Sequence, residues 1–100
     1  MFRIDPNRVD LAREYKARPF GVHSGDLQMV LNLMRALPVE GHHVLVMSKP
    51  HREWTLAVMG GRPPRPRLQP SQVFTSLEAA EWHVFKLRWQ MLTGQPLQLD

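Results

Sequence analysis

The stretch FTSLEAAEWHVFKLRWQMLTGQ, Phe74 to Gln95, decides the fold because it has the signals of a long helix with two apolar faces. Thr75 and Glu78 have the spacing of a capping box, which predicts the N-terminus of a helix. Gly94 is typical of a helix C-terminus, where glycine readily adopts the left-handed backbone conformation. The sequence therefore predicts a C-terminal helix that runs to about Thr93.

At about 100° per residue, the apolar side chains of this helix separate into two stripes. An aliphatic stripe is suited to pack on a sheet, and it consists of Leu77, Ala80, Val84, Leu87 and Met91. An aromatic stripe consists of Trp82, Phe85, Trp89 and Leu92. Two explanations are open for the aromatic stripe. It packs under the N-terminal part of the chain, or it binds a partner, since tryptophan is enriched in binding hot spots.

Two helices are expected before the first strand. Asp5 as the cap and Pro6 at the first helical position predict a helix that ends in basic residues near Arg18. Its apolar content is thin, so we expect it to lie on other elements rather than form a core. Ser24 is a suitable cap for a second helix, whose apolar residues recur at helical spacing over 27–37. Pro38 is expected to end that helix.

The middle of the chain predicts a β-hairpin. Val44–Met47 and Trp54–Met59 are rich in β-branched and bulky residues and are separated by turn-forming residues. Both runs are apolar on both faces, so one face should pack on helices and the other needs a cover. The stretch RPPRPRLQPSQ (62–72) contains four prolines and predicts an extended loop rather than a strand interior. It leaves room for a short third strand at 72–74.

These elements predict an α+β fold with two N-terminal helices, a hairpin with a short third strand, and a long C-terminal helix packed on the sheet. A chain of 100 residues is long enough for one modest core, so we expect a single domain. Within it, residues 1–20 form a helical arm, residues 21–94 an α-β-β-(β)-α core and residues 95–100 a tail.

The composition excludes several classes of protein. Hydrophobic residues make up 43% and charged residues 22% of the chain, which is close to the average of globular proteins. No run approaches the roughly 18 consecutive apolar residues of a membrane-spanning helix, and the N-terminus has no apolar signal core. The absence of cysteine excludes disulfides and thiolate metal sites and fits the cytoplasm, which is the expected location.

The residues do not suggest a self-contained active site. His42 and His43 are adjacent on a predicted strand, so their side chains should point to opposite faces and cannot bind one metal ion together. Glu81 is expected to pair with Lys86 or Arg88 on a solvated helix face. No glycine-rich phosphate loop or serine nucleophile motif is present. We therefore expect no catalytic residue, metal site or cofactor in this chain.

Basic residues gather in two loops, and the net charge is +4. Arg62, Arg65 and Arg67 lie on the proline-rich stretch, and residues 49–52 add further basic side chains in the hairpin turn. The three arginines either keep the loop soluble or contact an anion or a partner. Because a sheet with basic loops can bind DNA, a small nucleic-acid-binding domain is an alternative function.

Four short stretches, in this order, resemble the small subunit of N,N-dimethylformamidase. They are RPFG (18–21), DLQMVLNLMR (26–35), REW (52–54) and VFTSLEAAEWHVFKLR (73–88). The chain departs from that family in being shorter, basic and richer in proline over 61–70. The resemblance implies a non-catalytic accessory subunit that assembles with a larger subunit. The larger subunit would hold a mononuclear iron and hydrolyse the amide bond of small N-substituted formamides. A stand-alone homodimer is a third alternative.

Overall fold

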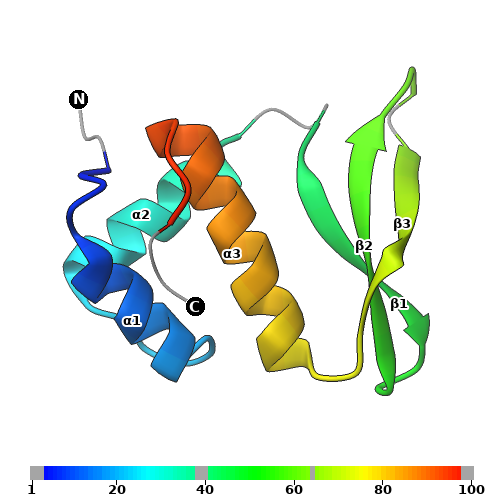
Figure 1. Cartoon of the computed structure of the whole chain (residues 1–100), viewed down its shortest axis with the longest axis horizontal. Helices are drawn as coiled ribbons and strands as arrows, with labels where there is room; N and C mark the ends of the chain where they lie inside the picture. Colours follow the sequence, from blue (N-terminus) through cyan, green and yellow to red (C-terminus); the bar gives the residue numbers. More distant parts are fainter. Residues whose placement is uncertain (1–3, 38–40, 64, 98–100) are drawn as a thin grey trace.

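The computed structural model of the chain describes residues 4–37, 41–63 and 65–97, and within them it confirms the expected α+β architecture. The helices are α1 (Val9–Ala17), α2 (Gly25–Arg35) and α3 (Leu77–Thr93), and the strands are β1 (His43–Lys49), β2 (Glu53–Gly60) and β3 (Arg65–Phe74). Figure 1 shows α3 between the α1–α2 pair and the sheet, so that all three helices lie on one side of the sheet.

The C-terminal helix begins one residue later than the capping box predicts. Ser76 is the N-cap, and its hydroxyl oxygen accepts a hydrogen bond from the backbone N–H of Ala79 at 3.3 Å. Glu78 accepts a hydrogen bond from the Ser76 hydroxyl at 3.0 Å, so the Thr75–Glu78 box is wrong. The predicted stop is confirmed, because Gly94 has a φ of 75° and donates its N–H to the Gln90 carbonyl oxygen.

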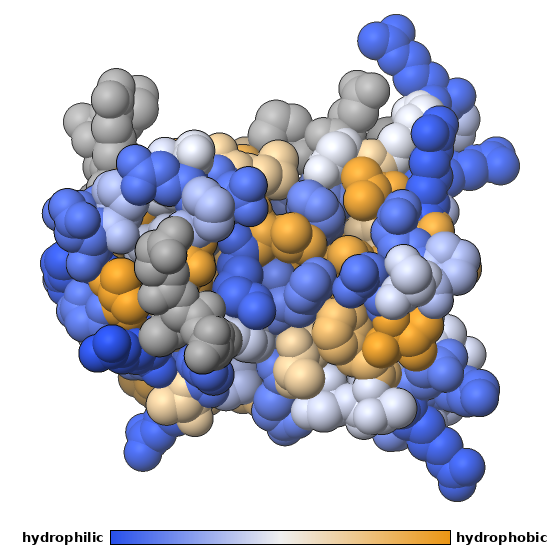
Figure 2. Space-filling view, viewed as in Figure 1, coloured by the Kyte–Doolittle hydropathy of each residue, from blue (hydrophilic) through white to orange (hydrophobic). Residues whose placement is uncertain are grey.

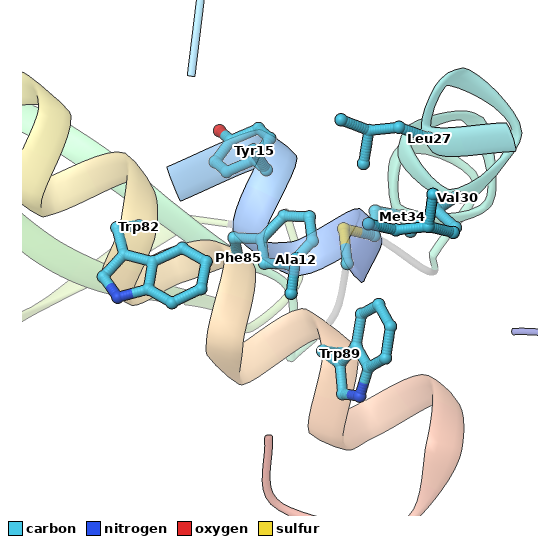
Figure 3. Packing of buried hydrophobic residues seen from close by; sticks show 9 residues of the cluster. Ala12, Tyr15, Leu27, Val30, Met34, Trp82, Phe85 and Trp89 are labelled. Atoms are coloured by element: carbon cyan, nitrogen blue, oxygen red, sulfur yellow. The ribbon is translucent and has the colours of Figure 1, made fainter. Parts of the chain in front are cut away.

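The aromatic stripe of α3 packs against the two N-terminal helices. Trp82, Phe85 and Trp89 are 9%, 2% and 1% exposed. They form one cluster with Leu11, Ala12 and Tyr15 of α1 and Leu27, Val30 and Met34 of α2 (Figure 3). At its centre the ring of Phe85 stacks on the ring of Tyr15, with 4.3 Å between centroids. Within the chain, the aromatic stripe therefore packs under the N-terminal helices, which is the first of the two explanations given above.

The aliphatic stripe lies on the opposite side of α3, and α3 contacts all three strands. Ala80 and Val84, in the middle of the stripe, are 0% and 1% exposed, and Leu56 of the sheet is also buried. Met91, near the C-terminal end, is 48% exposed and extends past the covered area. Both long faces of α3 are therefore used inside the chain.

The first helix is shorter than expected and contributes more to the core. It begins at Val9 without a side-chain cap, because Asp5 instead accepts a hydrogen bond from the N–H of Asn7 and stabilises the preceding turn. Pro6 therefore lies outside the helix. Helix α1 does lie on other elements, as expected, but its three buried side chains make it a part of the core.

The second helix has the predicted cap and the predicted buried stripe. The hydroxyl oxygen of Ser24 accepts a hydrogen bond from the N–H of Leu27 at 3.3 Å. The same hydroxyl donates to Glu14 of α1 at 2.6 Å, and the Ser24 N–H donates to the other carboxylate oxygen at 2.7 Å. One serine thus caps α2 and ties it to α1. Pro38, expected to end this helix, lies outside the described residues.

The sheet is antiparallel with strand order β1-β2-β3. The expected hairpin is confirmed, but β3 spans ten residues and includes much of the stretch predicted to be a loop. Prolines are tolerated because β3 is an edge strand, where alternate backbone N–H groups have no partner strand. Pro66 pairs with Met59. Pro70 lies in a bulge of β3, where the four residues 69–72 separate two pairs that have only one residue between them on β2. These pairs are Thr55–Val73 and Ala57–Leu68.

We expect Ser24→Ala to lower the free energy of unfolding by about 1 kcal/mol, because α2 loses its N-cap. Urea denaturation followed by circular dichroism measures the change. Ser71→Ala, at an exposed position of β3, is the matched control and should leave stability unchanged. A Ser24→Ala chain as stable as the control would contradict the role of the cap.

Trp89→Ala should cost about 3–5 kcal/mol, because it opens a large cavity in a closely packed cluster. In contrast, Met91→Ala, at the uncovered C-terminal end of the aliphatic stripe, should change stability by less than about 0.5 kcal/mol. Thermal unfolding of the isolated chain compares the two variants. Equal and small losses would show that the aromatic stripe is not packed inside the isolated chain.

Candidate functional site

The face of the sheet that points away from α3 follows from the pairing of the strands. The ring of Phe74 lies 5.2 Å from the ring of His83 on α3, so Phe74 points towards the helix. Trp54 pairs with Phe74 and shares that face. Because side chains alternate along a strand, Thr55 and its partner Val73 point to the opposite face.

This opposite face, the outer sheet face, is largely apolar. Its central part consists of two cross-strand rows, Val44–Ala57–Leu68 and Val46–Thr55–Val73. Leu68 and Val73 are 51% and 43% exposed, whereas the short side chains of Ala57 and Thr55 are enclosed by their larger neighbours. Figure 2 shows hydrophobic side chains at the surface over the sheet half of the molecule. Because the helices all lie on the other side of the sheet, no helix of the described chain covers this face.

The three arginines of the proline-rich stretch come together at one end of the sheet. Arg62 lies in the turn after β2, and Arg65 and Arg67 occupy the first part of β3. All three are exposed, and Arg67 lies across Gly60, where a Cβ would be 3.5 Å from Nε. The basic residues at 49–52 lie in the other hairpin turn, at the opposite end of the sheet. The two basic loops therefore do not form one continuous surface.

The residues predicted to contact a partner have little surface left for one. Trp82, Phe85 and Trp89 are enclosed by α1 and α2, and Leu92 packs against the edge of the same cluster. Two ammonium groups also lie near the Trp82 ring, since Lys16 and Lys86 each place Nζ 5.6 Å from its centroid. A partner could reach this stripe only if α1 and α2 moved away.

A second feature is a cleft of about 260 Å³ among α1, α2 and α3, which we call the helix cleft. Its lining includes five polar or charged side chains: Tyr15, His23, Arg35, Glu81 and Arg88. The Tyr15 hydroxyl donates to Glu81 over a long 3.5 Å, and burial, followed by the nearby Glu81, raises the pKa of Tyr15 to about 12. Tyr15 is therefore a protonated donor at neutral pH.

Arg88 links α3 to the start of β1. Its Nη2 donates to the carbonyl oxygen of His43 at 2.8 Å and to Nε2 of His42 at 2.9 Å, so His42 carries its proton on Nδ1. His42 precedes β1, and its ring bonds Arg88 of α3. His43 lines a hollow together with Leu87 and Met91 of α3. Both histidines therefore lie on the α3 side, which corrects the expectation of two histidines on opposite faces of one strand. Burial lowers the pKa of Arg88, and its Nε is buried without a hydrogen-bond partner.

The expected pairing of Glu81 is wrong. Among the described residues Glu81 forms no ion pair with Lys86 or Arg88, and its carboxylate faces Tyr15 instead. Sequence reasoning could not find this group, because Tyr15 and Glu81 are 66 residues apart. It did find a signal for the outer sheet face, since β1 and β2 are apolar on both faces. It missed Leu68, because the surrounding prolines obscured the strand.

The described part of the chain shows neither a cluster of metal ligands nor a membrane-spanning helix. Residues 4–37, 41–63 and 65–97 contain no group of three or more histidine, cysteine, aspartate or glutamate residues placed to hold a metal ion. None of the helices in these ranges is long and apolar enough to cross a membrane.

Stability should fall as the pH is lowered from about 7.5 to about 5.5. Burial, followed by the charge of Arg88, lowers the pKa of His42 and of His43 below 6.5 in the folded chain. Below that pH the unfolded chain therefore binds more protons than the folded chain, and stability is lost. His42→Gln, which keeps a neutral acceptor for Arg88, should reduce this loss in thermal unfolding at both pH values. His51→Asn, at an exposed turn position with a φ of 57°, is the control and should lose as much as the unaltered chain.

Comparisons with known proteins place the chain in a family. A family model described as "N,N-dimethylformamidase alpha subunit" matches residues 4–97. No curated protein matches the chain. The match spans nearly the whole sequence and includes all of the helices and strands described above. The chain therefore belongs to the N,N-dimethylformamidase alpha subunit family.

Proposed function

We propose that this chain is a non-catalytic accessory subunit that assembles with a larger, amide-hydrolysing subunit. The family description names one subunit of an enzyme, which supports a second chain as the partner. In this proposal the larger subunit holds the iron and hydrolyses small N-substituted formamides, as the resemblance implies. The absence of cysteine favours the cytoplasm as the place of assembly.

The observation that carries this proposal is the uncovered, apolar outer sheet face. Leu68 and Val73 expose about half of their surface on a face with no helix against it. Exposed apolar patches of this kind mark interaction sites, because the buried centre of a protein interface is apolar. We assign the partner contact to this face, because the aromatic stripe of α3 is already covered by α1 and α2.

The arginines at the end of the sheet favour an acidic partner surface. Arg62, Arg65 and Arg67 are exposed at the end of the sheet next to the β2–β3 turn, and the chain carries a net charge of +4. Because side chains alternate along β3, Arg65 and Arg67 project from the face opposite to that of Leu68, around the edge of the sheet from the outer sheet face. Charges at the rim of an interface mainly speed association and select the partner, while the apolar centre supplies affinity. We therefore propose that the larger subunit meets this end of the sheet with carboxylates.

We expect the double variant Leu68→Glu/Val73→Glu to weaken assembly by at least about tenfold, or ~1.4 kcal/mol, because carboxylates would be buried in an apolar interface. The experiment co-expresses the chain with its larger subunit and follows co-elution, with hydrolysis of N,N-dimethylformamide identifying the partner. Met29→Glu, at a 44% exposed position on α2, is the matched control and should co-elute like the unaltered chain. Replacing the three arginines by glutamine should slow association at low salt.

Three outcomes would contradict the proposal. Full co-elution of the double variant would exclude the outer sheet face as the contact. A stable dimer of the isolated chain that the double variant dissociates would favour the homodimer. Binding to duplex DNA that falls steeply with salt would favour the nucleic-acid-binding alternative.

A further inference from the structure

The helix cleft has a charge balance that favours an anion. Two guanidinium groups, those of Arg35 and Arg88, line it together with one carboxylate, that of Glu81. Neither arginine forms an ion pair among the described residues. The acceptors that Arg88 does have, an imidazole nitrogen and a backbone oxygen, carry no negative charge. The cleft therefore retains an excess of one positive charge.

A hydrogen-bond donor is available beside these cations. The Tyr15 hydroxyl stays protonated at neutral pH, and its hydrogen bond within the described part of the chain is the long contact to Glu81. Figure 3 shows the Tyr15 oxygen at the edge of the aromatic cluster, pointing away from the other labelled side chains. Guanidinium and phenol donors that line the same cleft suit a carboxylate, which accepts charge-assisted hydrogen bonds.

Apart from His23, the remaining lining residues of the cleft are apolar. Pro19 and Phe20 come from the loop between α1 and α2, and Leu31 and Met34 come from α2. Phe20 is 49% exposed, which is unusual for a phenylalanine next to a packed cluster. A ligand with a short hydrocarbon group would cover part of this surface.

The size and charge of the cleft limit the class of ligand. Its volume of about 260 Å³ is below the roughly 300–1,000 Å³ typical of pockets for drug-sized ligands, so nucleotides are too large. The carboxylate of Glu81 opposes a doubly charged phosphate more strongly than a singly charged group.

We propose that the helix cleft binds a small aliphatic monocarboxylate. The ligand carboxylate meets Arg88, Arg35 and Tyr15, and its hydrocarbon group lies against Phe20, Leu31 and Met34. The lining residues of this site belong to the three helices and the loop between α1 and α2, and Figure 1 shows these elements away from the outer sheet face. The inference therefore stands independently of the proposed assembly.

The test uses the full chain and isobutyrate as the probe, with the neutral amide isobutyramide as its isosteric control. Titration followed by amide NMR shifts should give saturable isobutyrate binding with a dissociation constant on the order of 1 mM. Isobutyramide should bind at least about tenfold more weakly, because it lacks the negative charge. No saturation with isobutyrate, or equal binding of the two probes, would overturn the proposal.

Three variants locate the site. Arg35→Gln, at an exposed position, should weaken isobutyrate binding several-fold, while Arg13→Gln on the exposed face of α1 should leave it unchanged. Glu81→Gln should strengthen binding several-fold, since it removes the opposing carboxylate. Simple damage to the fold could not produce this gain. Equal effects of Arg35→Gln and Arg13→Gln, or weaker binding by Glu81→Gln, would contradict the assignment.

Discussion

The structure depends on the burial of α3 on two sides. A helix with one apolar stripe can pack on one neighbour, whereas α3 carries an aliphatic stripe and an aromatic stripe on opposite sides. Phe85 and Trp89 provide the surface on which α1 and the apolar stripe of α2 pack. On the other side of α3, the small side chains of Ala80 and Val84 allow close packing on the sheet. Without α3, neither the helix pair nor the sheet has a counterpart on which to bury its apolar face.

This arrangement determines which surfaces remain for function. The helices bury their large aromatic side chains in one cluster, so the aromatic stripe is used for folding. The sheet has an equally apolar second face and no helix to cover it. An antiparallel sheet normally presents polar residues to solvent, and the departure from that rule at Leu68 and Val73 is a physical reason to expect another chain there. Membership in a family of enzyme subunits agrees with that expectation.

Polar side chains also connect α3 to α1 and to the sheet. Arg88 reaches from α3 to the start of β1, and Tyr15 reaches from α1 to Glu81 on α3. A guanidinium in this position cannot lose its charge, so the folded chain must solvate it with neutral acceptors and leave Nε without a partner. Such incompletely satisfied groups cost stability, and they are found where a structure can gain from binding a ligand.

Local signals in the sequence determined the features that depend on neighbouring residues. The cap at Ser24, the stop at Gly94, the stripe of α2 and the two stripes of α3 could all be predicted, because each depends on contacts within a few residues. The sequence also predicted that the aliphatic stripe of α3 packs on the sheet. Only the tertiary structure decided that α1 and α2 cover the aromatic stripe, because an apolar stripe does not record what covers it. The tertiary structure also decided the length of β3. Its prolines fit a strand because β3 is at the edge of the sheet, and that position follows from the pairing with β2. The meeting of Tyr15, Glu81 and Arg88 likewise depends on contacts between distant parts of the chain, which no local pattern records.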